Sequence, residues 1–399
     1  MLQASQRLDH TVTFQALEIT KQARLLKESG QDIIGLGIGE PDFTAPPIVV
    51  ETLQHAAQAG LSGYSPTLGL TQLRMSIADY YKQEFGAPIS YEQVIITTGG
   101  SGALLLACMS LLNPGDEIIM PDPYYPANYN FILSAGATTK LIPTTAEERF
   151  QLSADKIAAN WGEKTRGILI ASPSNPTGTT ITKDELSKII RVVKSKGGFV
   201  ILDEIYLGLS YEGTAESGLC IDPDIIVINS FSKFFNMTGW RLGWMIAPTY
   251  FVPKIENLSA SLNICPPTLA QHAAISCFAE EAMEIYRARR LAFKERRDYL
   301  LIELERLKLR VPVKPEGAFY IYADISHYSN DSMEFCQRLL RETGVVVTPG
   351  LDFGPAFANN TIRISYSTGL DRIKEAMSRL EKFLANNYSP SLDWVWCHG

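Results

Sequence analysis

Residues 199–206 read Phe-Val-Ile-Leu-Asp-Glu-Ile-Tyr. Four consecutive apolar residues, with no polar alternation, are typical of a β-strand that is buried on both faces. The run ends on Asp203, and a carboxylate at the end of an apolar strand is costly unless it has a partner. The stretch therefore predicts a strand inside a parallel sheet that carries a carboxylate to a binding site.

Four other short apolar runs of the same kind lie along the chain, at residues 94–96, 118–120, 168–170 and 225–228. Amphipathic stretches separate them, and helices are expected at residues 101–112 and 182–196. The second helix begins with Thr182 and has Glu185 three residues later, which is the pattern of a capping box. Strands alternating with helices predict an α/β fold, with a three-layer large domain around a mainly parallel sheet.

The pattern changes after about residue 280. A long charged helical stretch covers residues 281–308 and is followed by short strands and helices, which predicts a smaller α+β domain. The first 45 residues hold one helical stretch and one extended run, and they are expected to join this domain. We therefore predict a large domain at residues 46–280 and a small domain formed by residues 1–45 and 281–399.

Composition narrows the classes of function. The 399 residues include 36 Lys and Arg against 43 Asp and Glu, a formal net charge of −7. This net negative charge argues against electrostatic binding to nucleic acid or to anionic lipid.

No apolar run approaches the ~18 residues of a membrane span, and no export signal is expected. The six cysteines are scattered and the five histidines lack metal-ligand spacing, which predicts a cytoplasmic protein with reduced thiols and no metal site.

Polar and glycine-rich segments follow the predicted strands. In an open parallel sheet, ligands bind beyond the carboxyl ends of the strands, which meet at one edge. These segments are therefore expected to form one site. They are residues 99–102, Tyr124 and Tyr125, Asn175, residues 203–206 and residues 230–233.

The glycine-rich segment Gly99-Gly100-Ser101-Gly102 is placed to open a helix. Free N–H groups and the helix dipole at such a terminus favour an anion such as phosphate. A nucleotide-binding GxxxxGK[ST] loop is missing from the sequence. Residues 35–39 read Gly-Leu-Gly-Ile-Gly, but Glu40 and Pro41 follow where a dinucleotide fingerprint needs a glycine and a helix. A nicotinamide site of the Rossmann type is therefore excluded.

A longer motif lies at residues 230–243, which read Ser-Phe-Ser-Lys-Phe-Phe-Asn-Met-Thr-Gly-Trp-Arg-Leu-Gly. It resembles the cofactor attachment site of class I/II pyridoxal-phosphate-dependent aminotransferases, the fold-type I or aspartate aminotransferase superfamily. The resemblance covers roughly residues 12–386 and leaves the tail, residues 387–399, without a counterpart. Further segments resemble family motifs in family order: residues 39–43, 64–66, 175–178, 203–206, 317–320 and 362–365.

The resemblance implies pyridoxal 5'-phosphate as the cofactor. Lys233 is expected to hold it as a Schiff base and then, as a free amine, to move a proton at the substrate Cα. Asp203 resembles the residue that keeps the ring nitrogen protonated. Tyr206 and Asn175 resemble the donors to the phenolic oxygen of the ring, and Tyr125 is expected to stack on the ring. Tyr124 remains the alternative for this last role.

The phosphate of the cofactor is assigned by the same resemblance to a cluster of polar groups. A guanidinium offers a planar fork of donors that suits phosphate. Tyr64 resembles a residue that reaches the phosphate of the neighbouring subunit, which implies a homodimer with shared active sites. The other expected phosphate ligands are Gly100, Ser101, Ser230, Ser232 and Arg241.

Arg363 lies in the motif Thr-Ile-Arg-Ile-Ser at residues 361–365. By resemblance it is the clamp for the α-carboxylate of the substrate, helped by the backbone N–H of Gly39 and by Asn175. Some relatives that use aspartate carry a lysine in the glycine loop, where this chain has Ser101. A neutral, aromatic or small amino donor is therefore favoured over aspartate.

The predicted function is ping-pong transfer of an amino group between an L-amino acid and a 2-oxo acid. A pyridoxal-phosphate-dependent β-lyase, or a related elimination enzyme of the same fold, is the alternative. A transcription regulator with an aminotransferase-like domain would carry a DNA-binding domain of about seventy residues first. The motif at residues 39–43 begins too early for that arrangement.

Overall fold

A seven-stranded sheet forms the centre of the protein in this computed structural model, which describes residues 2–388. The strand order is β2-β8-β7-β6-β5-β3-β4, and all neighbours run parallel except β8, which is antiparallel to both β2 and β7. The prediction of a mainly parallel sheet in an α/β fold is confirmed. The strands are β2 (Val94–Thr97), β3 (Glu117–Asp122), β4 (Thr138–Pro143), β5 (Thr165–Ala171), β6 (Phe199–Asp203), β7 (Ile226–Ser230) and β8 (Gly243–Ile246).

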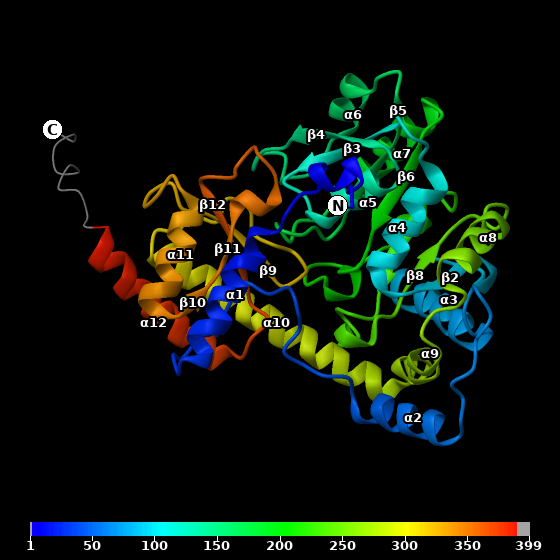
Figure 1. The fold of residues 1–399 in the computed structure, drawn as a ribbon, viewed down its shortest axis with the longest axis horizontal. Coiled ribbons are helices and arrows are strands. Elements are labelled where there is room, and N and C mark those ends of the chain that lie inside the picture. Colours follow the sequence, from blue (N-terminus) through cyan, green and yellow to red (C-terminus); the bar gives the residue numbers. More distant parts are fainter. Residues whose placement is uncertain (1, 389–399) are drawn as a thin grey trace.

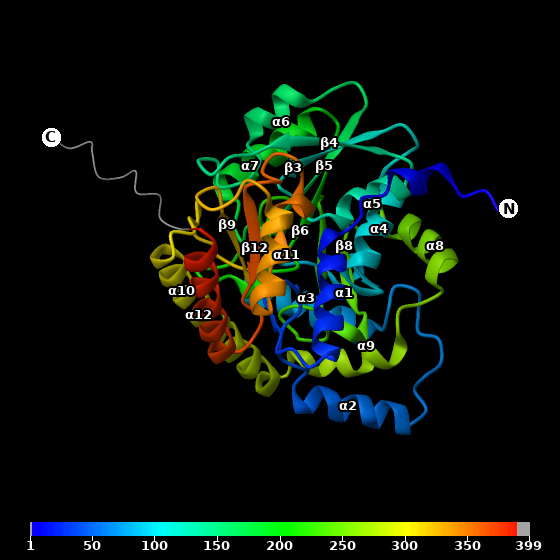
Figure 2. The same cartoon turned by 60° about the vertical axis from the view of Figure 1, so that its left-hand side comes forward.

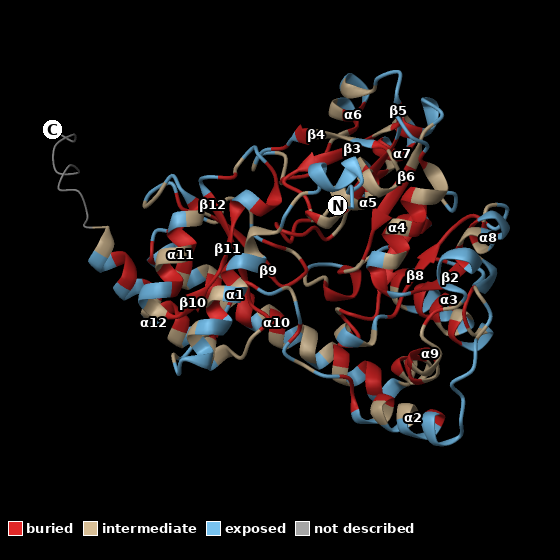
Figure 3. Cartoon of the chain, viewed as in Figure 1, coloured by how far each residue is buried: buried red, intermediate tan, exposed pale blue. Residues whose placement is uncertain are grey.

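Alternate residues of each central strand enter different hydrophobic cores. In β6, Val200 and Leu202 belong to one cluster and Ile201 to the other, as expected for side chains that point to opposite faces. The two faces are therefore both covered, which gives three layers. One face carries α4 (Gly99–Leu111), α5 (Ala127–Ser134) and α8 (Val252–Asn263); the other carries α3 (Thr71–Phe85), α6 (Ala154–Asn160), α7 (Lys183–Ser195) and α9 (Thr268–Ile275). Figure 3 shows the buried strands between helices whose outer surfaces are exposed.

Two small sheets lie beside the large one (Figure 1). The first pairs β1 (Ile34–Gly35) in parallel with β10 (Val345–Val346), so the N-terminal segment packs against the C-terminal part of the chain. The second has the order β11-β12-β9 and is antiparallel. Its strands are β9 (Tyr320–Asp324), β11 (Thr348–Pro349) and β12 (Thr361–Ser365).

Helices surround the small sheets. Figures 1 and 2 show α1, α11 and α12 beside them, and α10 running from the end near α9 toward α12. The helix α2, near α9, lies away from this group. The bounds are α1 (Gln15–Glu28), α2 (Pro47–Gln58), α10 (Glu280–Arg306), α11 (Ser332–Thr343) and α12 (Leu370–Asn387). Within residues 2–388, none of the helices combines the length and apolarity needed to cross a bilayer.

The capping box predicted at the start of α7 forms only in part. The Thr182 hydroxyl accepts a hydrogen bond from the Glu185 N–H at 3.3 Å, as predicted. The Glu185 carboxylate, however, accepts from the N–H of Ala154 at 2.8 Å. It therefore stabilises the free N-terminus of the neighbouring helix α6 in place of its own.

Candidate active site

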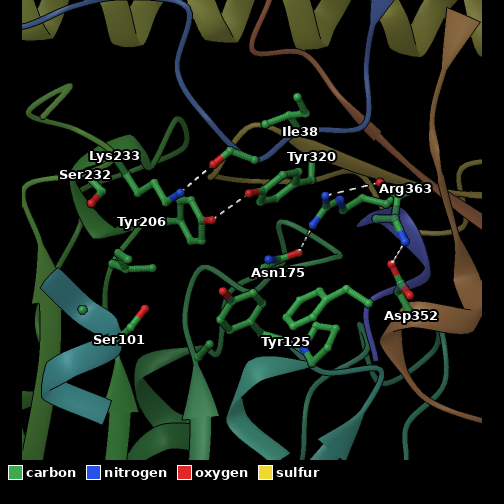
Figure 4. A pocket seen from close by; sticks show the side chains of 18 of the residues that line it. Ile38, Ser101, Tyr125, Asn175, Tyr206, Ser232, Lys233, Tyr320, Asp352 and Arg363 are labelled. Carbon is green, nitrogen blue, oxygen red and sulfur yellow. Dashed lines mark hydrogen bonds between the residues drawn. The ribbon is translucent and has the colours of Figure 1, made fainter. Parts of the chain in front are cut away.

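A cavity of about 430 Å³ lies at the carboxyl edge of the large sheet. Residues of the large sheet, the three-stranded small sheet and α1 line it together (Figure 4). Because β2, β3, β5, β6 and β7 run parallel, the segments that follow them meet here, as the sequence predicts. The predicted site residues in its lining are Gly39, Gly100, Ser101, Tyr125, Asn175, Asp203, Tyr206, Ser230, Ser232, Lys233, Arg241 and Arg363.

Tyr64 is the one predicted site residue that does not line this cavity within the described chain. Its side chain is 82% exposed. An aromatic side chain so open to solvent, on a loop next to the helix α3, makes no contribution to the site of its own subunit. The prediction that it serves a neighbouring subunit stays a prediction.

Lys233 projects into the cavity just beyond β7. Its ammonium donates a hydrogen bond to the carbonyl oxygen of Gly39 at 2.6 Å. Burial lowers the pKa of this amine to about 8, and the positive charges of Arg363 and Arg241 contribute in the same direction. A lysine with a lowered pKa has a neutral, nucleophilic form available near neutral pH.

Asp203 lines the cavity at the end of β6 and is 5% exposed. Its carboxylate accepts the Ile205 N–H at 3.0 Å. Desolvation raises the pKa of Asp203 to about 6, although that N–H and the charge of Lys233 oppose the shift. A carboxylate held in such a place favours a cationic N–H partner.

Tyr206 and Asn175 approach the cavity from different loops. The Tyr206 hydroxyl is 2.8 Å from that of Tyr320, and burial raises the pKa of Tyr206 well above its usual value, so the phenol stays protonated. Asn175 accepts a hydrogen bond from Arg363 Nη1 at 2.9 Å through its side-chain oxygen. The amide NH₂ group is therefore free to donate elsewhere.

The start of α4 forms one end of the cavity, as expected for an anion site. Gly99 has a φ of +72°, and a Cβ at that position would lie 2.6 Å from Nη2 of Arg241. Gly243 has the same kind of constraint, because a Cβ there would lie 2.6 Å from the Gly100 nitrogen. The absence of a side chain at Gly99 therefore lets the Arg241 guanidinium come close to the N-terminus of α4, and its absence at Gly243 lets strand β8 do the same. The Ser230 hydroxyl lies beside them and accepts from the Ser232 N–H at 3.0 Å.

Arg363 reaches the opposite end of the cavity from the middle of β12. Its Nη2 donates to the Gly37 carbonyl oxygen at 2.7 Å, and its guanidinium lies 4.4 Å from the centre of the Tyr320 ring. The Nε atom is buried and has no hydrogen-bond partner in the described chain. A buried, unpaired donor on a cation is costly unless a ligand completes it.

Tyr124 and Tyr125, the two alternatives for stacking on the ring, lie in different surroundings. Tyr125 lines the cavity and is labelled in Figure 4. Tyr124 instead packs in the hydrophobic core on the α4 side of the large sheet. The stacking role of Tyr125 remains a prediction.

Two parts of the cavity wall have no counterpart in the predicted site. Tyr320 bonds Tyr206 and stacks on Arg363, and a Cβ on Gly39 would overlap its hydroxyl. Asp352 and helix α1 form another part of the wall. The motif at residues 317–320 was a signal for Tyr320, but no sequence feature connected α1 with Asp352.

The donor set fits pyridoxal phosphate. An anion can sit at the start of α4 beside Ser230, Ser232 and Arg241, and a ring N–H can meet the buried Asp203 carboxylate. Lys233, which makes no ion pair within residues 2–388, can react with an aldehyde between them. No cluster of metal ligands occurs among those residues.

Comparison with known proteins agrees with this geometry. The family described as aminotransferase class I and II matches residues 31–380. A valine–pyruvate aminotransferase of Mycobacterium tuberculosis is 35% identical over 93% of this chain and 96% of its own length. An aspartate aminotransferase of Thermotoga maritima is 34% identical over 95% and 99%. The crystal structure of an aminotransferase from Mycobacterium tuberculosis superposes with a TM-score of 0.93 at 34% identity, over 97% of this chain and 100% of that one. The chain therefore belongs to the class I and II aminotransferases, which depend on pyridoxal phosphate.

Proposed function

We propose that the cavity at the edge of the large sheet is the transamination site, with Lys233 as the reacting side chain. The amino group moves from an L-amino acid to a 2-oxo acid in two half-reactions, and the first product leaves before the acceptor enters. When bound, pyridoxal phosphate takes up the amino group and withdraws electrons from the substrate Cα. Lys233 Nζ takes the proton from that Cα, for which its lowered pKa suits it.

The observation that carries this proposal is the unpartnered Nε of Arg363. It lies on a buried cation in the lining of the cavity that also holds Lys233. A carboxylate is the natural partner for a guanidinium edge. We assign the α-carboxylate of the substrate to this edge, with the Gly39 N–H and the Asn175 amide as further donors. The substrate Cα is then held within reach of Lys233.

The other residues hold the cofactor in this proposal. Asp203 keeps its ring nitrogen protonated, because a buried carboxylate that makes no ion pair within residues 2–388 favours that proton. Tyr206 and Asn175 donate to its ring oxygen, and Tyr125 covers the ring face. The phosphate ligands are Gly100, Ser101, Ser230, Ser232 and Arg241.

A pair of substrates tests the reaction type. The holoenzyme incubated with one amino acid and either 2-oxoglutarate or pyruvate should produce the amino acid that corresponds to the acceptor, which chromatography detects. The initial-rate plots against both substrates should be parallel lines. Ammonia and a 2-oxo acid released without any acceptor would contradict this proposal and establish a β-lyase.

We also propose a homodimer in which Tyr64 completes the site of the partner. The loop at residues 60–65 lies next to the segment 264–266 that follows helix α8, because Gln271 Nε2 donates both to Ser65 Oγ and to the carbonyl oxygen of Pro266. Large apolar side chains on this loop, at the end of α8 and just after it are exposed, which is typical of a surface that a partner covers. They are Leu61, Tyr64, Leu262 and Ile264.

Mixed dimers test the shared site. Lys233→Ala and Tyr64→Phe homodimers should both be impaired, whereas a dimer with one chain of each kind contains one intact site. After random exchange of equal amounts of subunits, about half of the dimers are mixed and each has one of its two sites intact, so we expect the mixture to recover about a quarter of the wild-type activity. Tyr250→Phe, on another exposed tyrosine, is the control and should behave as wild type. A mixture no more active than its components would disprove the sharing.

The domain boundaries and the location also remain proposals. We retain a large domain at residues 46–280 and a small domain formed by residues 1–45 and 281–399, of which residues 389–399 lie outside the described part. The pairing of β1 with β10 supports a small domain built from both chain ends. The five described cysteines are free, which supports a cytoplasmic location.

A further inference from the structure

The charges that line the cavity are few. Its cationic side chains, within the described chain, are Lys233, Arg241 and Arg363. The proposed function assigns the first two to the cofactor and the third to the α-carboxylate. The acids in the lining are Asp203, which faces the cofactor, and Asp352. Once cofactor and α-carboxylate are bound, Asp352 is the one charged group left in this lining for the substrate side chain to meet.

Asp352 is committed to helix α1. Its two carboxylate oxygens accept the N–H groups of Gln15 at 2.6 Å and Ala16 at 2.9 Å, in the first turn of that helix. The side chain is buried. Its negative charge at the helix N-terminus stabilises the first turn. Asp352 therefore fixes α1 against the cavity rather than offering a hydrogen bond to a ligand.

The wall that α1 presents to the cavity is mainly apolar. Leu17 and Thr20 of α1 line it with Phe14, the residue before the helix, and Ile38 also lines the cavity (Figure 4 labels Ile38 and Asp352). Leu17 is 64% exposed and Ile38 is 50% exposed. Apolar side chains that open into a cavity gain free energy when an apolar ligand covers them. The Phe14 ring also meets the edge of Tyr125, with centroids 6.4 Å apart, so the apolar wall continues to the proposed cofactor face.

We propose that the amino donors of this chain have an uncharged, apolar side chain, and that Leu17, on an α1 held by Asp352, and Ile38, elsewhere in the cavity lining, determine this specificity. This inference rests on the proposed function. A second carboxylate, as in aspartate or glutamate, would lose water against Leu17 and Ile38 without a further cation among the described residues of this subunit's lining to replace it, and would face the charge of Asp352. Both effects are unfavourable.

Half-reactions with single donors test the specificity. The holoenzyme is mixed with valine, leucine, methionine, phenylalanine, alanine, aspartate or glutamate without an acceptor, and the change of cofactor absorbance gives kcat/KM. At least one larger apolar donor should exceed aspartate and glutamate by about 100-fold. Preference for aspartate or glutamate would overturn the inference and leave the transaminase assignment intact. No conversion by any donor would overturn both.

A positive charge introduced on α1 tests whether the α1 side of the cavity determines the preference among amino donors. Leu17→Arg should raise the ratio of kcat/KM for aspartate to that for leucine by at least about tenfold, because it supplies a partner for the second carboxylate. Leu25→Arg is the matched control, on the same helix, 53% exposed and outside the cavity lining. An equal change of the ratio in both variants would contradict the role of Leu17.

The role of Asp352 as a positioning residue has its own readout. Asp352→Asn keeps the size of the side chain but sets an NH₂ group against one of the two α1 amides. We expect KM to rise for leucine and phenylalanine and to change little for alanine, whose methyl group does not reach α1. A general folding defect would lower activity with all three donors alike, and that outcome would refute the positioning role.

Discussion

Replacing Lys233 by alanine is expected to slow amino transfer by at least about 10³-fold, the upper part of the range for losing a positioned acid–base group. The variant should also bind pyridoxal phosphate without a covalent bond. The physical reason is the state of the amine. With a pKa of about 8, roughly one molecule in ten carries neutral Lys233 at pH 7, against fewer than one in a thousand for an unperturbed lysine.

Two measurements check this prediction. The visible absorbance that marks covalently held cofactor should disappear after Lys233→Ala, and single-turnover mixing should show no fast conversion of any donor. Lys254→Ala, on the exposed side of α8, is the control and should leave both unchanged. If the Lys233→Ala protein kept the covalent absorbance, another side chain would have to be the reacting amine.

The sequence predicts the central strands because their environment leaves a clear pattern. β3, β5, β6 and β7 are buried on both faces and therefore read as uninterrupted apolar runs. β4 was missed because it is an edge strand whose first three residues, Thr138 to Lys140, are polar, so only Leu141 and Ile142 remain as an apolar run. β8 was missed because it is only four residues long and follows a long loop. Nothing in so short a segment indicates that the strand runs antiparallel to its neighbours.

The site residues likewise fall into those that a local sequence pattern predicts and those that it does not. Residues directly after the strands, such as Asp203 and Lys233, could be placed from sequence because the carboxyl ends of parallel strands meet at one edge. The contact of Asp352 with Gln15 joins residues 337 positions apart, and no local pattern encodes such a distance. Glu185 shows the same limit at short range, since its carboxylate caps α6 although its spacing predicts a contact at its own helix.

Replacing Arg363 is expected to weaken every substrate. Arg363→Ala removes the charge and the planar fork, and the loss of two charge-assisted hydrogen bonds, at about 1.5–3 kcal/mol each, lowers kcat/KM by roughly 10²–10⁴-fold. Arg363→Lys keeps the charge but loses the fork and the stacking on Tyr320. It should therefore fall between wild type and alanine.

The pattern across substrates distinguishes a shared clamp from a reader of side chains. An α-carboxylate occurs in every amino acid and every 2-oxo acid, so the loss in Arg363→Ala should be of similar size for valine, phenylalanine, aspartate and their oxo acids, measured as kcat/KM for each half-reaction. Arg191→Ala, on the exposed face of α7, is the control. A loss confined to one donor would assign Arg363 to that side chain and contradict the clamp. Because Nη1 and Nη2 already bond Asn175 and Gly37, the guanidinium is held in position before a substrate arrives, and the unpartnered Nε supplies a donor that a carboxylate can meet at little cost in side-chain entropy.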